Sequence, residues 1–143
     1  MIDIHNPSQR MRYIAIALFA ITVILLFYLG SMPFAVGLFK EPWDKLAHFV
    51  AYAAIATLLC LGIAPRKMPL LIVLITSAIG FADEWHQISL PGRSVDLSDL
   101  LTDAVAAIFA ITVYSVISTY QARTLGTLAH NCISTKDTPP CAE

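Results

Sequence analysis

The residues most able to do chemistry lie between Gly80 and Asp103, in the stretch GFADEWHQISLPGRSVDLSDLLTD. Its charged and titratable side chains are Asp83, Glu84, His86, Arg93, Asp96, Asp99 and Asp103. Carboxylates and imidazoles at this density can exchange protons or ligate a metal, and a guanidinium can hold a phosphate through two hydrogen bonds. Because long apolar runs lie on both sides, this concentration of polar groups needs a specific reason.

A second polar pattern lies earlier in the chain, in the segment DKLAHFVAY, which begins at Asp44. Asp44, His48 and Tyr52 recur at i, i+4 and i+8, so a helix would place them on one face. The same rule puts Asp83 with Gln87 on one face of the next helix, with His86 beside them. Asp96, Asp99 and Asp103 follow at i, i+3 and i+7. Three helices therefore each carry a polar stripe near one end.

The composition identifies the setting of these stripes. The chain has 143 residues, of which 57% are hydrophobic and 13% charged, and its mean hydropathy is +0.71. These values exceed those of an ordinary soluble domain and indicate an integral membrane protein. No basic patch typical of nucleic-acid binding is present. The three cysteines show no CxxC spacing, so neither a zinc finger nor a redox dithiol is indicated.

We predict an all-α fold, a compact bundle of four transmembrane helices, from four apolar runs. The first run, 13–30, has 18 residues and spans roughly 27 Å, close to the hydrocarbon thickness of about 30 Å. The others are expected at 44–63, 68–88 and 96–118, with Asp96 or Ser94 capping the last. Gly80 is expected to permit close helix approach. Residues 1–12 form a polar N-terminal segment, 13–118 the membrane domain, and 119–143 a polar, partly disordered tail.

The basic residues predict the orientation of these helices. Arg10 and Arg12 precede the first helix, Arg66 and Lys67 separate the second from the third, and Arg123 follows the fourth. The positive-inside rule places these positions, and both termini, in the cytoplasm. The three polar stripes then converge at the extracytoplasmic side, as either a substrate pocket or a buried ion-pair network requires.

At these residues the sequence resembles the VanZ-like family of small bacterial membrane proteins. The resemblance lies in three blocks, DKLAHFVAY, DEWHQ and PGRSVDLSD, and covers roughly residues 44–110. The family commonly has asparagine where this chain has Asp103. The family name comes from a protein linked to resistance against the glycopeptide teicoplanin. The resemblance thus implies a role in the cell envelope, on cell-wall precursors, their lipid carrier or surface glycolipids, and it implies no settled reaction.

The site residues are expected to have three kinds of role. His48, Asp83 and Glu84 are candidates for acid–base catalysis or ligation, because crowding raises the pKa of some carboxyl groups in an acidic cluster. Arg93, Gln87, Tyr52 and Ser94 are candidates for substrate binding. Asp44, Lys45, His86, Asp96, Asp99 and Asp103 are candidates for orienting those groups or forming an ion network.

Two alternatives stay open at this point. Arg93 either holds a lipid-linked phosphate or neutralises neighbouring acids. His48 with Asp83, Glu84 and Asp99 has the donor atoms to bind a divalent metal, although no HExxH spacing supports one, and no other cofactor is indicated. Nucleophilic catalysis has little support, because Ser94 lacks a GxSxG motif.

Two functions therefore remain. The first is an envelope protein that binds or modifies a lipid-linked substrate, such as a cell-wall precursor or an isoprenoid phosphate. The second is a non-enzymatic membrane module whose charged cluster only holds the helices together. Membrane lipids are expected partners in both, and a homodimer is compatible with the modest interior of four helices.

Overall fold

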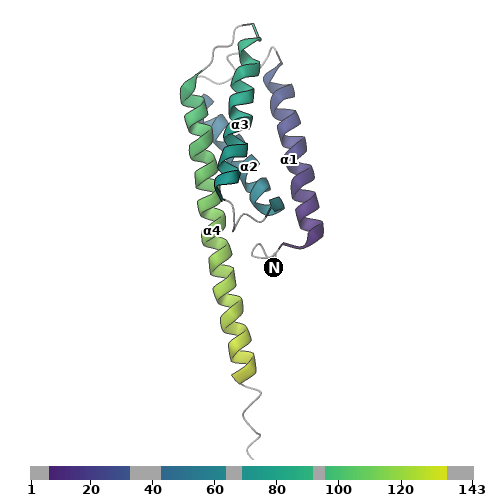
Figure 1. The fold of residues 1–143 in the computed structure, drawn as a ribbon, viewed down its shortest axis with the longest axis vertical. Coiled ribbons are helices and arrows are strands. Elements are labelled where there is room, and N and C mark those ends of the chain that lie inside the picture. Colours follow the sequence, from purple (N-terminus) through teal and green to yellow (C-terminus); the bar gives the residue numbers. More distant parts are fainter. Residues whose placement is uncertain (1–6, 33–42, 64–68, 92–95, 135–143) are drawn as a thin grey trace, which may run out of the picture.

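The computed structural model describes residues 7–32, 43–63, 69–91 and 96–134, and it is all-helical there (Figure 1). The helices are α1 (Gln9–Gly30), α2 (Trp43–Ile63), α3 (Pro69–Ile88) and α4 (Leu97–Ser134). The prediction of four helices is confirmed, with bounds close to those expected for α2 and α3. Among the described residues, α1, α2 and α4 are long and apolar enough to cross a membrane.

Local sequence explains where the helices begin. The Ser8 hydroxyl accepts a hydrogen bond from the Met11 amide at 3.3 Å and so caps α1. This cap lets α1 start at Gln9, four residues before the apolar run. Pro69 is the first residue of α3, where its missing N–H costs nothing. Asp96 precedes α4, and its carboxylate accepts from the Ser98 amide at 2.8 Å. The predicted capping by Asp96 is therefore confirmed.

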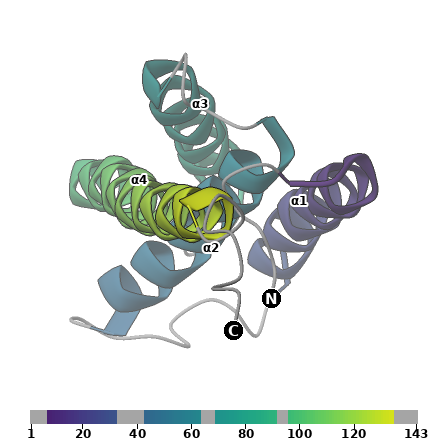
Figure 2. The ribbon, with the colours of Figure 1, turned by 90° about the horizontal axis from the view of Figure 1, so that it is seen from below.

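The helices pack so that α2 and α4 form the main contact, with α1 against α2 and α3 against α4. Viewed along the long axis, α4 lies between α3 and α2, and α1 lies to one side (Figure 2). The core between them combines large and small side chains: Tyr52, Ile55, Ala56, Leu59, Cys60, Ile72, Ala106, Ala107, Ala110 and Tyr114. Of these, the three alanines of α4, Ala106, Ala107 and Ala110, let that helix approach α2 closely, as small residues do between membrane helices.

The outer surface of the bundle is apolar. Ala15 is the buried residue of α1, whose other side chains are at least partly exposed. Large apolar residues are exposed on every helix, for example Ile24, Leu74 and Phe109. A surface of this kind suits lipid rather than water.

The end of α4 differs from the prediction. The helix was expected to end about Ser118 and to be followed by a partly disordered tail, but it continues to Ser134. Its 38 residues give it a length of about 57 Å, well beyond a bilayer core of about 30 Å. Figure 1 shows it leaving the other helices behind. Residues such as Gln121, Ala122 and Arg123 favour helix without apolar periodicity, which explains the difference. Residues 135–143 lie outside the described part.

Candidate functional site

The polar stripes meet at one end of the bundle, where α1 and α3 end and α2 and α4 begin (Figure 1). We call the group there the polar cluster; it comprises Lys45, His48, Tyr52, Asp83, Glu84, Gln87, Asp96, Ser98, Asp99 and Asp103. Each of α2, α3 and α4 contributes several members. The predicted convergence of three helix faces is therefore present in the structure.

His48 is held between two carboxylates of α4. Its Nδ1 lies 3.2 Å from Asp103 Oδ1, and its Nε2 lies 3.9 Å from Asp99 Oδ2. The ring also stacks on Tyr52 one turn further along α2, with centroids 5.8 Å apart and an interplanar angle of 10°. These contacts fix the ring plane, with Nδ1 toward the interior of the bundle and Nε2 toward Asp99.

Lys45 ties the start of α2 to the start of α4. Its ammonium group donates to Asp96 Oδ2 at 3.0 Å, to Asp99 Oδ1 at 3.2 Å, and to the Ser98 hydroxyl. The Ser98 amide and hydroxyl, and then the Lys45 ammonium, lower the pKa of the Asp96 carboxyl to about 2. These contacts hold the start of α2 against the start of α4, and they occupy the Lys45 ammonium group.

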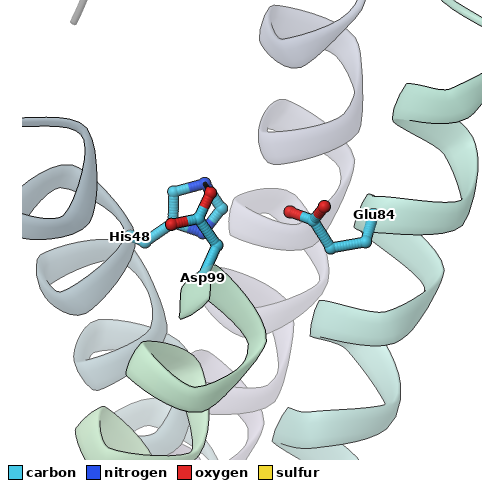
Figure 3. Close-up of side chains that lie close together, drawn as sticks. All are labelled: His48, Glu84 and Asp99. Carbon is cyan, nitrogen blue, oxygen red and sulfur yellow. Dashed lines mark ion pairs between the residues drawn. The ribbon is translucent and has the colours of Figure 1, made fainter. Parts of the chain in front are cut away.

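Glu84 of α3 faces His48 and Asp99 across the site (Figure 3). One oxygen, Oε2, accepts from the Asp96 amide at 3.1 Å. The other, Oε1, is buried without a hydrogen-bond partner among the described residues. One ligand atom from each of His48, Glu84 and Asp99 can be chosen so that all lie within 4.8 Å of one another. The Glu84 side chain therefore keeps acceptor capacity pointed at an imidazole and a second carboxylate.

Asp83 has a different environment from its neighbour Glu84. Its Oδ2 accepts from Gln87 Nε2 at 3.0 Å, one turn along α3, which confirms the shared face of this pair. Its Oδ1 lies 3.9 Å from where a Cβ on Gly30 of α1 would stand. Asp83 is thus buried toward α1, whereas Glu84 is directed toward α2 and α4.

Gly80 sets the distance between α3 and α4 at the inner limit of the cluster. A Cβ at this position would lie 2.5 Å from Asp103 Oδ2, closer than atoms can approach. The expectation that Gly80 permits close helix approach is confirmed, and the group it admits is a fully buried carboxylate. Asp103 Oδ2 has no hydrogen-bond partner among the described residues.

Two predicted members lie apart from the cluster. His86 turns toward α1, where its ring meets Phe27 edge-on at 5.6 Å and its Nε2 lies 3.4 Å from the Ser31 hydroxyl. Asp44 at the start of α2 forms no ion pair with another described residue. Arg93 and Ser94 lie outside the described residues, so their predicted roles stay predictions.

Ser98 is a member that the sequence reasoning missed. It accepts from Lys45 through its hydroxyl and donates its amide to Asp96. A signal for it existed, because residues in the first turn after an aspartate cap lie near that carboxylate.

The comparisons with known proteins identify a family for this chain. No curated protein and no solved structure matches the chain. The model of the VanZ/LLP1 family matches residues 5–118, which include α1, α2, α3 and the part of α4 that packs in the bundle. The match agrees with the resemblance of DKLAHFVAY, DEWHQ and PGRSVDLSD. This multi-pass membrane protein, with its polar cluster at one end, belongs to the VanZ/LLP1 family.

Proposed function

We propose that this protein binds a lipid-linked, phosphate-bearing substrate at the polar cluster and acts on it, or presents it, in the bacterial cell envelope. All four helices cross the inner membrane, with the cluster at the extracytoplasmic face and both termini in the cytoplasm. A lipid-linked phosphate is amphipathic, so its head group would enter between helix ends while its chain stays in the bilayer. The family's link to teicoplanin resistance favours an envelope substrate.

The orientation is supported by the basic residues at the opposite end of the bundle. Arg10 and Arg12 lie in the first turn of α1, and Arg12 Nε donates to the carbonyl of Gly62, in the last turn of α2, at 2.9 Å. Arg123 lies in α4 after Ser118, the last buried residue of that helix among those described. Positive residues of this kind are retained in the cytoplasm, which leaves the polar cluster on the outer side.

The observation that carries the proposal is the burial of Glu84 with one oxygen that has no hydrogen-bond partner among the described residues. Burying a carboxylate in an apolar bundle is costly, and an unsatisfied oxygen adds about 1–3 kcal/mol. A purely structural network would be expected to satisfy this group. An acceptor kept free beside an imidazole is suited to take or give a proton, or to ligate, when a substrate arrives.

The roles of the residues follow from their positions. His48 and Glu84 lie across the site from each other and would move the proton or ligate. Asp83 lies with Gln87 on the side toward α1, and Tyr52 stacks on the His48 ring. Asp96 and Asp99 orient Lys45. Arg93 and Ser94 follow α3 in the sequence and would hold the head group.

The second candidate, a non-enzymatic module, is favoured by a different observation. Lys45 bridges to Asp96 and Asp99, and His48 bridges to Asp103. These contacts join α2 to α4 and would serve an ion network without any substrate. The two candidates differ in what removal of Arg93 would do.

Native mass spectrometry of the protein extracted gently from bacterial membranes tests the proposal. Wild type should carry an isoprenoid phosphate or another phosphate-bearing lipid, and Arg93→Ala should lose it at an unchanged yield. Arg10→Ala, a charge removal at the opposite end, is the matched control and should keep the lipid. The spectra also report whether the protein is a monomer or a homodimer. If wild type carries no more phosphate-bearing lipid than Arg93→Ala, the proposal is wrong and the structural candidate remains.

A further inference from the structure

We infer that His48, Glu84 and Asp99 form a binding site for a divalent transition metal such as Zn²⁺. The three residues come from three different helices, α2, α3 and α4, and the Glu84 carboxylate points toward His48 and Asp99 (Figure 3). This inference deepens the proposed function, and it rests on that function only for the role of the metal toward a phosphate.

The donor set and its spacing fit such an ion. One imidazole nitrogen and two carboxylate oxygens lie within 4.8 Å of one another. Ligands around a zinc ion stand about 2.0–2.2 Å from it, so that neighbouring ligands are roughly 3.5 Å apart. A small closing movement of the side chains would meet this geometry. The nitrogen ligand favours a transition metal over Mg²⁺ or Ca²⁺, which take oxygen ligands.

The unpartnered oxygen of Glu84 is an independent indication of a ligand. Glu84 is 4% exposed, and its Oε1 has no hydrogen-bond partner among the described residues. Its other oxygen is held by the Asp96 amide, which fixes the direction of the carboxylate. A metal ion would complete the coordination of this oxygen and remove the cost of its burial.

Asp103 supplies the supporting contact that metal-bound histidines require. Its carboxylate lies 3.2 Å from His48 Nδ1, so that nitrogen can donate its proton to Asp103. The other nitrogen, Nε2, is then unprotonated and faces Asp99. A histidine bonded to a carboxylate on one side and to a metal on the other is the usual arrangement in zinc proteins. The packing of Asp103 over Gly80 holds that carboxylate in place.

Charge also favours a cation at this position. The cluster contains five carboxylates, Asp83, Glu84, Asp96, Asp99 and Asp103, and Lys45 is its lysine. Five carboxylates outweigh the charge of one lysine, so the net negative cluster repels a phosphate. A divalent ion on His48, Glu84 and Asp99 would reduce the negative charge by two, and three protein ligands would leave a coordination position for a phosphate oxygen.

Equilibrium dialysis of the purified full-length protein against Zn²⁺, after treatment with EDTA, tests the site without any lipid. Wild type should retain about one zinc ion per chain. Glu84→Gln and Asp99→Asn should each bind zinc at least about 100-fold more weakly, and Asp103→Asn about 10–100-fold more weakly. Asp44→Asn removes a carboxylate at the same end of the bundle but outside the three ligands, and it should bind zinc as wild type does.

Unfolding temperatures measured in parallel show whether each variant is folded. Zinc should raise the unfolding temperature of wild type and of Asp44→Asn, and it should leave those of Glu84→Gln and Asp99→Asn unchanged. If wild type binds zinc no more tightly than both Glu84→Gln and Asp99→Asn, the metal site is wrong, whatever lipid the protein carries. If zinc binds as expected but no phosphate-bearing lipid is found, the metal site stands and the lipid proposal fails.

Discussion

The two ends of the bundle place polar groups among apolar helices in opposite ways. At the polar cluster, the side chains of Asp83, Glu84, Asp99 and Asp103 are buried between helices. Glu84 and Asp103 each keep one oxygen that has no hydrogen-bond partner in the part of the chain that the structure describes. At the other end, Arg12 is exposed at the start of α1 and donates to the last turn of α2, and α4 continues outward as an exposed helix. Burial with incomplete hydrogen bonding is costly. This difference is what supports the proposed binding role of the polar cluster, whereas the Arg12 contact satisfies a helix end.

The largest effect expected from this comparison is at Asp103. Asp103→Ala would leave His48 without its nearest carboxylate partner and would open a cavity beside Gly80. Removing one member of a buried ion pair costs about 3–5 kcal/mol, so the free energy of unfolding should fall by about that amount. Denaturant titration in detergent micelles, with EDTA present to exclude metal, measures it.

Asp103→Asn is the matched control for this substitution. Its amide oxygen can still accept from His48, and asparagine is the residue expected here from the resemblance to the family. The free energy of unfolding should fall much less in Asp103→Asn than in Asp103→Ala. Equal stability of the two variants would mean that the His48–Asp103 contact does not hold α2 to α4.

The next largest effect distinguishes the packed end from the free extension of α4. Gly80→Ala would place a Cβ 2.5 Å from Asp103 Oδ2, and overpacking of this kind costs about 1–3 kcal/mol. Gly126→Ala makes the same change where nothing lies within 4 Å, and it should stabilise the helix by up to about 1 kcal/mol.

The same titration compares both alanine variants with wild type, and helical content by circular dichroism supports the Gly126 result. Both substitutions add the same methyl group. The opposite signs of their effects on the free energy of unfolding are therefore the informative result. Should Gly80→Ala be as stable as Gly126→Ala, the close approach of α3 and α4 would be refuted.

Much of this arrangement could be predicted from the sequence. Apolar runs of about 20 residues specify helices directly, and the spacings of His48 with Tyr52 and of Asp99 with Asp103 placed each pair on one face. Gly80 was recognisable because a small residue one turn before a carboxylate permits a close contact. The family match over residues 5–118 agrees with the residues that carried the resemblance.

Other features depended on helix rotation, which spacing alone does not give. At about 100° per residue, His86 points roughly 160° away from Glu84. Once Glu84 faces α2 and α4, His86 must turn toward α1 and Phe27. The distinction between Asp83 and Glu84 has the same cause. The end of α4 was missed because helix propensity, not burial, extends it to Ser134.

The smallest effect concerns the rim of the polar cluster and depends on pH. The amide and hydroxyl of Ser98 and the Lys45 ammonium lower the pKa of Asp96 to about 2, from an unfolded value of about 3.9. A depressed pKa in the folded state means that the ionised carboxylate stabilises the fold. This contribution is fully present above about pH 4 and is lost as the pH falls toward about 2.

Asp96→Asn isolates this contribution, because asparagine can still cap α4 but carries no charge for Lys45. Wild type should be slightly more stable than Asp96→Asn at pH 7, and the difference should shrink between about pH 4 and pH 2. Gly126→Ala changes no charge, so the stability difference between this variant and wild type should stay constant over the same pH range. A wild-type advantage that persists undiminished at pH 2 would show that Asp96 acts through its shape alone. The charge of the Asp96 carboxylate would then contribute nothing to holding α2 against α4.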